Sequence, residues 1–413
     1  MHIHGYVRKV LPVIAEYGRW DDILCLISEN SATSGIKTEV LEFIKQQMIK
    51  DFNDMKENKP VSLLFKWLPS TFSKNEEQRN IAKQIRNYLH INEKRYRVAC
   101  SKMRKYIDVV ERKMSKNEWD KIKYESVPSK ANLIYKDAFL RHDHDRRMEY
   151  LESLQKGETK INAKKLFPYE IYRKANEYED ITVEQLWKNL PELKSDTESV
   201  LCVADGSGSM SWANLGNTNA TALDVANSLA IYFAERAKGE FKDTYITFSS
   251  NPQIVKLGHD NKLYEKKQIA EKHCECSNTN IEKTFELILD TAKKNKMEQS
   301  EMPTTILILS DMEFDSATYE YYDSSRPTKA LFTKLEEKYN SAGYKMPRLV
   351  FWNICGRTNT IPVTKNELGV ALVSGFSTTI FDMVLNNKLD PLEILLDKLN
   401  TPRYLKIKEL IEQ

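Results

Sequence analysis

Three short segments of the sequence carry side chains of the kind that hold a divalent metal ion. The strongest is DGSGSM, in which Asp205 and two hydroxyl residues, Ser207 and Ser209, stand at alternate positions. A turn with this spacing can point several oxygens at one place, as a hard cation requires. Two further oxygen donors follow, Thr279 in SNTNIEKTF and Asp311 in LILSDMEFD. With two carboxylates and no His or Cys, the set favours Mg²⁺, with Mn²⁺ or Ca²⁺ as alternatives.

The elements expected around these donors form an α/β domain. From about residue 196, short apolar runs alternate with helical stretches, which is typical of a mostly parallel sheet covered on both faces. Asp205 and Asp311 end two of these runs, and ligands of open parallel sheets bind outside the carboxyl ends of the strands. A turn at Asn251 and Pro252 predicts one short antiparallel strand at an edge. The apolar runs are SVLCVAD, TYITFSS, TTILILSD, RLVFWNI and GVALVSG.

The first half of the chain is predicted to be helical. Four segments place apolar residues three and four apart over several turns: VRKVLPVIAEYGRWDDILCLIS, TEVLEFIKQQMIKDFNDMKEN, EEQRNIAKQIRNYLH and RYRVACSKMRKYIDVVERKMSK. They show no clean sequence period, so we expect an irregular, HEAT-like array of stacked helices. We therefore predict a helical-repeat domain at 1–195, an α/β domain at 196–388 and closing helices at 389–413.

Charge separates the two halves of the chain. Residues 1–197 hold 37 Lys and Arg against 30 Asp and Glu, whereas residues 198–413 hold 25 against 29. The basic excess includes eleven Lys and Arg between Lys94 and Lys123, interleaved with aromatic residues. Such a run could track the backbone of RNA or DNA, or it could be a solvated surface with core-facing aromatics. The candidate nucleic-acid-binding residues are Lys94, Arg95, Arg97, Lys102, Arg104, Lys105, Arg112 and Lys113.

A catalytic role for the metal would need a general base or a second metal near it. No His lies in the three donor segments, and Glu313 and Asp315 are the only candidates for a base. An acidic pair in a loop more often solvates the loop than reacts. Binding is therefore favoured over turnover, and a Mg²⁺-dependent nuclease or phosphatase is the least favoured function.

Composition bounds the class of protein. The chain has 413 residues, of which 41% are hydrophobic and 29% charged, as expected for a globular protein of two or three domains. No apolar run approaches the roughly 18 to 20 residues of a membrane helix, and the first nine residues are not followed by the apolar stretch of a signal peptide. We expect an intracellular, cytoplasmic protein without a membrane partner, or a component of a virus particle if the source is viral.

The five oxygen donors resemble the metal-ion-dependent adhesion site of von Willebrand factor A domains. The pattern of that site is DxSxS, then a Thr, then an Asp after a later strand, and all five positions match here. The resemblance covers about residues 198–385. It implies a Rossmann-like α/β fold and an ion that accepts an oxygen from an acidic group of a partner protein or from a phosphate.

Longer strings resemble the TROVE/Ro-like family of unknown function, which joins an N-terminal helical region to a von Willebrand factor A domain. They include YGRWDDIL, SLLFKWLPS, VPSKANLIYKDAFLRHD, KLFPYEI and VFWN, and they run from about residue 17 to residue 376. In Ro ribonucleoproteins the helical repeats form a ring closed by the A domain, and RNA binds the ring. The resemblance therefore implies an RNA-binding scaffold. A metal-dependent protein-interaction module without nucleic acid remains the alternative.

Overall fold

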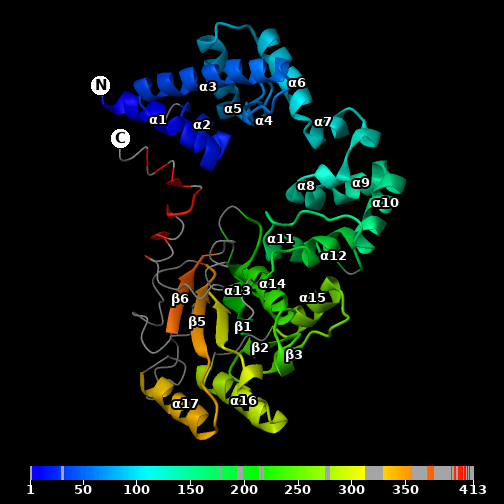
Figure 1. The fold of residues 1–413 in the computed structure, drawn as a ribbon, viewed down its shortest axis with the longest axis vertical. Coiled ribbons are helices and arrows are strands. Elements are labelled where there is room, and N and C mark those ends of the chain that lie inside the picture. Colours follow the sequence, from blue (N-terminus) through cyan, green and yellow to red (C-terminus); the bar gives the residue numbers. More distant parts are fainter. Residues whose placement is uncertain are drawn as a thin grey trace. The chain divides into compact units, whose positions relative to one another are not determined.

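The computed structural model describes most of the chain as two compact units. It describes residues 2–28, 32–176, 178–192, 199–213, 215, 218–274, 280–311, 329–355 and 370–375, together with scattered positions between 392 and 409. Residues 1–123 and 396–413 make up unit 1, and residues 124–395 make up unit 2 (Figure 1). Each unit has its own core, so each is described by itself.

Unit 1 is built from helices, as its periodicity predicts. Asn75 and Asn92 begin two of them, because each side chain accepts a hydrogen bond from a backbone N–H three residues on. The helix expected over residues 95–116 is interrupted at Asp108, whose left-handed φ of 57° ends its first part. The helices are α1 (His2–Tyr17), α2 (Trp20–Cys25), α3 (Ser34–Lys56), α4 (Leu64–Trp67), α5 (Glu76–Tyr88), α6 (Glu93–Ile107), α7 (Val110–Ser115) and the 3₁₀ turn η1 (Trp119–Lys121).

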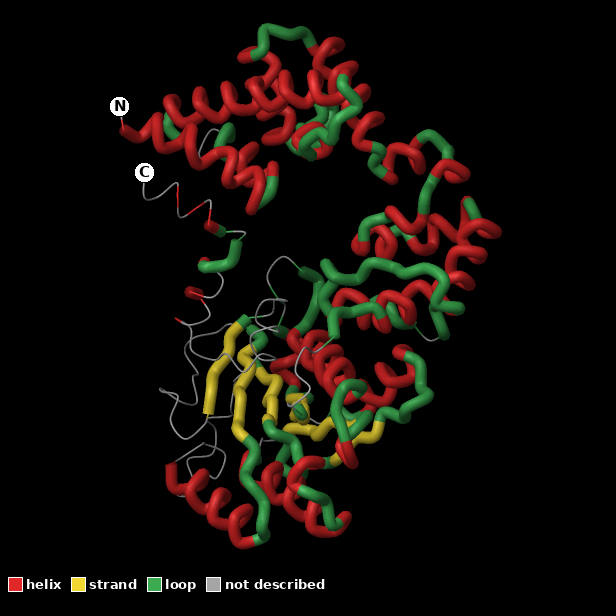
Figure 2. Tube along the Cα trace, viewed as in Figure 1, coloured by secondary structure: helices red, strands yellow, loops and turns green. Residues whose placement is uncertain are grey.

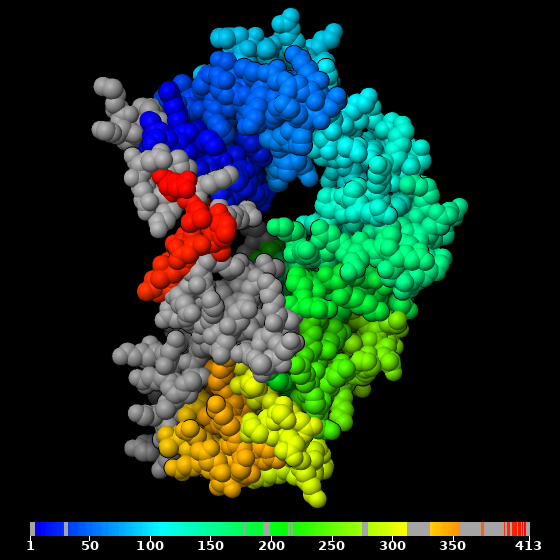
Figure 3. All heavy atoms as spheres, in the orientation of Figure 1, coloured from blue at the N-terminus to red at the C-terminus, as the bar shows by residue number. Residues whose placement is uncertain are grey.

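One apolar core joins the helices of unit 1. It includes Ile23 of α2, Ile44 of α3, Phe65 of α4, Ile85 of α5 and Met103 of α6. Figure 3 shows the outer surface of these helices in blue to cyan. Burial of these faces, rather than helix propensity, holds such short helices in place.

Two carboxylates fasten elements of unit 1 to α3. Asp51 is fully buried and accepts hydrogen bonds from the N–H and the hydroxyl of Ser62, at 3.0 and 2.6 Å. This pair holds the connection between α3 and α4. Glu42 accepts hydrogen bonds from Gln46 and from the hydroxyl of Tyr88 on α5, at 2.6 and 2.8 Å. These bonds to its ionised form lower the pKa of Glu42 to about 2.

The end of the chain returns to unit 1. The ring of Tyr404 stacks on that of Tyr17 in α1, with centroids 5.4 Å apart. Most of the closing helices predicted at 389–413 lies outside the described residues.

Unit 2 opens with a second set of helices, which surrounds a buried arginine. Arg147 is fully buried and donates hydrogen bonds to Asn132 and Thr182, at 3.1 and 3.2 Å. Its guanidinium also lies over the rings of Tyr124 and Phe139, 4.9 and 5.2 Å from their centroids. One side chain thereby ties together elements from both ends of the segment. These elements are η2 (Tyr124–Ser126), α8 (Ser129–Ile134), α9 (Lys136–His142), α10 (His144–Gln155), α11 (Pro168–Tyr172) and α12 (Ile181–Lys188).

A six-stranded sheet forms the centre of unit 2. The order of its strands is β3-β2-β1-β4-β5-β6, and every neighbouring pair is parallel except β2 and β3. The predicted α/β class and the antiparallel strand after the Asn251 turn are therefore confirmed. The strands are β1 (Val200–Asp205), β2 (Thr244–Phe248), β3 (Ile254–Lys256), β4 (Thr305–Ser310), β5 (Arg348–Asn353) and β6 (Val370–Ser374).

Helices cover the sheet on both faces. On one face α16 (Ile281–Asn295) and α17 (Lys329–Ser341) pack against alternate strand residues such as Leu201, Val203 and Ile306. On the other face α14 (Ala222–Ala234) lies against β1, β2 and β4, and α11 and α15 (Leu263–Lys272) pack against it in turn (Figure 2). Burial on both faces explains the continuous apolar runs of the strands.

The helices before the sheet belong to the same compact unit as the sheet. Trp187 of α12 donates a hydrogen bond to Glu235 after α14, at 2.8 Å, and Glu184 accepts one from the N–H of Leu263, at 2.7 Å. The change of secondary structure expected near residue 196 is therefore seen at β1, whereas the two compact units divide earlier, after Lys123. Within the described parts of both units, no helix is long and apolar enough to cross a membrane.

Candidate metal centre and nucleic-acid interface

The predicted metal ligands Asp205 and Asp311 lie at the carboxyl ends of two adjacent parallel strands. Asp205 ends β1 in the middle of the sheet, and Asp311 follows β4 directly. The register pairs Ala204 with Leu309, so the two strands end level with each other. Both carboxyl groups are buried, Asp205 with only 2% of its surface exposed. The strand pairing therefore brings two acidic groups to the edge where parallel sheets bind ligands.

The two predicted serines lie in the turn that follows β1. The N–H of Ser207 donates to Asp205 Oδ1 at 2.9 Å, and the hydroxyls of Ser207 and Ser209 lie 3.0 Å apart. Ser207 is also the residue before the short helix α13 (Gly208–Trp212). The structure thus brings Asp205, Ser207 and Ser209 together in one loop beside Asp311. Thr279 lies outside the described residues, as do Glu313 and Asp315, the candidates for a base.

The electrostatics of this cluster favour a bound cation. Burial raises the pKa of Asp205, hydrogen bonds from Ser310 and Ser207 oppose that rise, and the negative charge of Asp311 adds to it. The two carboxylates are thus close enough to repel each other in a place that water reaches poorly. A divalent ion between them would remove this repulsion, and carboxylate and hydroxyl oxygens are the donors that Mg²⁺ takes. By this test the described residues fit the metal that the sequence implies.

Three residues at this edge were not predicted. Ser310 ends β4, and its hydroxyl donates to Asp205 Oδ2 at 2.6 Å, which orients the carboxylate. Cys355 follows β5, and burial together with the charge of Asp311 raises the pKa of its thiol to about 11. Trp212 ends α13, three residues after Ser209, and 86% of its surface is exposed. The sequence held a signal for Ser310, because it directly precedes Asp311 at the end of an apolar run.

The eight candidate nucleic-acid-binding residues do not form one group. Arg104 donates from Nε to the carbonyl of Phe65 at 2.8 Å and from Nη2 to that of Leu68 at 2.6 Å, so it fastens α6 to the end of α4. Lys113 is held by Asp108, with Nζ and Oδ2 at 2.8 Å. These two cations have structural partners. The other six, Lys94, Arg95, Arg97, Lys102, Lys105 and Arg112, have no ion pair within 4.0 Å in the described part of the chain.

Four of these six cations share one side of α6. Lys94, Arg95, Lys102 and Lys105 are exposed, and helical geometry places them within about a third of the helix circumference. We call this stripe the outer face of α6. The aromatic residues interleaved with the basic run are not part of it. Tyr96 is buried and its hydroxyl donates to the carbonyl of Pro69 at 2.9 Å.

The other interleaved aromatics are also occupied. Trp119 and Tyr124 are buried, and the hydroxyl of Tyr106 donates to the carbonyl of Lys59 at 2.8 Å. Of the two interpretations left open by the sequence, the aromatic residues in and beside the basic run therefore fit the one with core-facing aromatics, since each serves the packing of its own unit. The outer face of α6 is a surface of charge.

Comparisons with known proteins cover both regions. Residues 199–398 match the family described as Domain of unknown function (DUF7788), and residues 72–205 match Domain of unknown function (DUF2828). The first range spans all five predicted metal ligands, and the second spans all eight predicted basic residues. The two ranges overlap at β1.

Two individual proteins are similar over nearly the whole chain. An uncharacterized protein of Acanthamoeba polyphaga mimivirus is 28% identical over 427 aligned residues, which cover 95% of this chain and 72% of that protein. Among solved structures, the Ro (RSR) protein of Deinococcus radiodurans aligns with 92% of this chain and 77% of its own, at 11% identity and a TM-score of 0.41.

Proposed function

We propose that this chain is a binding scaffold without catalytic activity, which binds RNA through its helical unit and an acidic ligand through a metal in its α/β unit. The observation that carries the RNA part is the outer face of α6. Lys94, Arg95, Lys102 and Lys105 are exposed there without ion pairs in the described residues, so their charge is free to meet phosphates. The strings that resemble TROVE/Ro-like proteins support the same proposal, and we place the chain in that group.

The salt dependence of RNA binding tests this proposal. We expect a fluorescent single-stranded RNA of about 20 nucleotides to bind, with an affinity that falls linearly on a log–log plot against salt. Each phosphate contact to a single strand contributes about 0.7 to the magnitude of this slope, so the loss of three contacts should reduce it by about two. The triple variant Lys94→Gln, Lys102→Gln and Lys105→Gln, called the outer-face variant, should show that reduction together with weaker binding.

A matched control removes the same number of charges elsewhere. Lys59, Lys121 and Lys334 are each held by a glutamate, at 2.6, 3.2 and 2.6 Å. Their replacement by Gln should leave the slope unchanged, because their charges are already neutralised. Absence of binding at low salt, or an equal loss in both triple variants, would contradict the RNA part of the proposal.

For the metal we propose Mg²⁺, held by Asp205, Ser207, Ser209 and Asp311, with Mn²⁺ or Ca²⁺ as substitutes and Thr279 as the expected fifth ligand. When bound, the ion supplies an electrophilic position for an oxygen of a carboxylate or phosphate. The residues of the loop determine the position at which that oxygen would bind. Ser310 holds one oxygen of Asp205 and the N–H of Ser207 holds the other, so the loop is ordered before a ligand arrives.

A second candidate function is protein capture at the metal without any role for nucleic acid. Trp212 favours it, because an indole that is 86% exposed three residues after a metal ligand offers an apolar contact to a partner. The probe is a synthetic peptide with one Glu flanked by apolar residues. Binding that needs Mg²⁺ and is lost in Trp212→Ala, in a protein that binds no RNA, would replace the first function by the second. A nuclease or phosphatase activity rests on Glu313 and Asp315 alone, which lie outside the described residues.

A further inference from the structure

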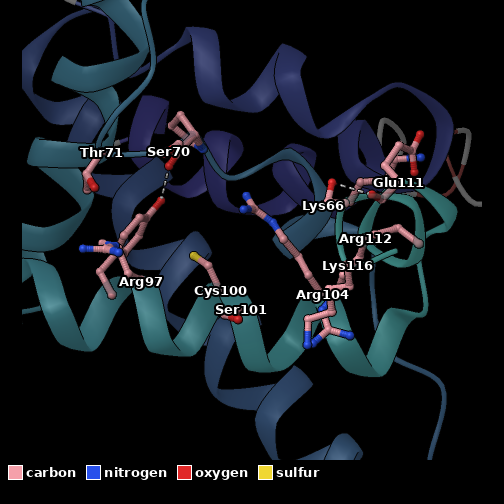
Figure 4. A pocket seen from close by; sticks show the side chains of 14 residues that line it. Lys66, Ser70, Thr71, Arg97, Cys100, Ser101, Arg104, Glu111, Arg112 and Lys116 are labelled. Carbon is pink, nitrogen blue, oxygen red and sulfur yellow. Dashed lines mark hydrogen bonds between the residues drawn. The ribbon is translucent and has the colours of Figure 1, made fainter. Parts of the chain in front are cut away.

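Unit 1 contains a cavity on a different side of α6 from the outer face. It has a volume of 590 Å³ and lies between the loop after α4, the middle of α6, and α7. Figure 4 shows Arg97 and Thr71 at one end of it, Arg112 and Lys116 at the other, and Arg104 between them. Its size is within the range of pockets that hold a nucleotide or a drug-sized molecule.

The cavity is strongly basic. Among the described residues that line it, five are cations, namely Lys66, Arg97, Arg104, Arg112 and Lys116, and Glu111 is the single carboxylate. Arg104 is held by two carbonyls, and the other four cations have no ion pair within 4.0 Å in the described residues. Elsewhere in unit 1 some cations are paired, as Arg8 is with Glu39.

This concentration of charge needs an explanation other than stability. Cations that share a small space repel one another, so the cluster weakens the fold unless an anion enters. A single phosphodiester carries one negative charge, whereas a terminal phosphate carries about two at neutral pH. The cavity therefore suits a phosphate at the end of a chain better than one in the middle. Arginine forks and lysines together are the side chains that bind such a group.

An aromatic ring lies beside the cavity. Phe72 is 68% exposed and follows Thr71, which lines the cavity. The guanidinium of Arg97, also in the lining, lies 4.7 Å from the centroid of the Phe72 ring. An exposed phenyl ring with a cation on one face is a platform on which a nucleobase can stack. A phosphate held near Arg97 would place its own base within reach of that ring.

We infer that this cavity binds the terminal phosphate of a single-stranded RNA, with the terminal base stacked on Phe72. The inference rests on the proposed RNA binding for the source of the phosphate, but it uses a different side of α6. The inference predicts that the protein distinguishes RNA with a terminal phosphate from RNA without one, to a degree that the outer face of α6 alone would not produce. RNA with a phosphorylated end should bind more tightly than the same RNA with a hydroxyl at that end.

The test compares two triple variants with three RNAs by fluorescence anisotropy. The RNAs are one twelve-nucleotide oligouridine with a 5′ phosphate, with a 3′ phosphate, or with neither. We expect the native protein to prefer one phosphorylated form by about tenfold. The cavity variant combines Lys66→Gln, Arg112→Gln and Lys116→Gln, and it should lose the preference for the phosphorylated RNA. The outer-face variant should weaken binding to all three RNAs equally and retain that preference. All six positions lie at the surface or half-buried, without side-chain bonds in the described residues, so folding is not at risk.

Phe72→Ala tests the stacking step, because an exposed ring can be removed without loss of packing. It should weaken the preferred RNA about tenfold, and Phe72→Trp should restore the binding. The proposal is overturned if the native protein binds all three RNAs with equal affinity, or if both triple variants lose affinity without any change in preference. It is also overturned if a phosphoserine peptide competes as well as the phosphorylated RNA.

A titration with adenosine monophosphate distinguishes a failure of the proposed RNA binding from a failure of the cavity to bind a phosphate. Calorimetric titration of this nucleotide reports on the cavity without the outer face. Binding that is lost in the cavity variant would support the cavity even if no RNA binds. No binding at millimolar concentration would overturn it.

Discussion

Replacement of Asp205 by Asn should abolish a Mg²⁺-dependent rise in the stability of unit 2, and should stabilise that unit when no divalent ion is present. The amide keeps the shape of the carboxylate. It can still accept from the N–H of Ser207, and it can donate to the hydroxyl of Ser310. The charge is lost, however, and with it both the attraction for the ion and the repulsion from Asp311 that raises the pKa of Asp205.

The expected size of the effect follows from linkage. If the site binds Mg²⁺ with a Kd of about 1 mM, then 10 mM Mg²⁺ stabilises the folded unit by about 1.4 kcal/mol. For a unit of about 270 residues, this corresponds to a rise in Tm of about 2 to 3 °C. Differential scanning calorimetry with 10 mM Mg²⁺ and with EDTA resolves such a shift. In EDTA, Asp205→Asn should unfold at a higher temperature than the native protein.

The control is Asp290→Asn, which removes an exposed carboxylate from α16 and should leave the Mg²⁺ response unchanged. The reasoning is refuted if Asp205→Asn responds to Mg²⁺ as the native protein does. It is refuted equally if the native protein, fully folded, shows no shift with Mg²⁺, Mn²⁺ or Ca²⁺.

Three further predictions concern buried or paired groups. Arg147→Ala should lower the free energy of unfolding by about 3 kcal/mol in urea denaturation, because it empties a buried site and leaves polar groups without partners, whereas exposed Glu149→Ala should change it by less than about 0.5 kcal/mol. Asp51→Ala should cost about 2 to 3 kcal/mol in the same assay, since the N–H and hydroxyl of Ser62 lose their acceptor. Glu42 stabilises unit 1 at pH values above its ordinary pKa of 4.5, and this stability is lost as the pH falls toward its folded pKa of about 2. In Glu42→Gln the urea midpoint should therefore fall less between pH 5 and pH 3 than in the native protein, and an equal fall would contradict the assignment.

The strands and the central helices of unit 2 were predictable because burial on both faces of the sheet requires continuous apolar runs in the strands. Runs such as TTILILSD have no polar alternation, and β4 proves to be buried throughout. The turn at Asn251 and Pro252 predicted the antiparallel strand by its chemistry alone. The two carboxylates that we predict to bind a metal could be placed at one edge of the sheet for the same reason, since Asp205 ends one such run and Asp311 follows another.

The division of the basic residues could not be predicted, because it depends on contacts with distant segments. Arg104 finds its carbonyl acceptors 36 and 39 residues earlier in the chain, and nothing in the pattern of α6 indicates them. Arg147 is likewise one residue in a charged string, RHDHDRR, yet only it is fully buried. The core position of Tyr96 was easier to predict, because Tyr96, Cys100 and Met103 lie on one face of the helix and form an apolar stripe.

Net charge alone therefore does not identify a ligand surface; what matters is which cations lack a partner and whether they gather. Paired cations such as Lys113 add to the charge of unit 1 but offer little to a phosphate. Cations without ion pairs would mean little if they were scattered, because exposed lysines are well solvated. Those of the outer face of α6 and of the cavity instead gather in two separate clusters, where their mutual repulsion opposes folding. A sequence that keeps both clusters in spite of that cost is best explained by two anionic contacts, one that tracks a backbone and one that holds an end.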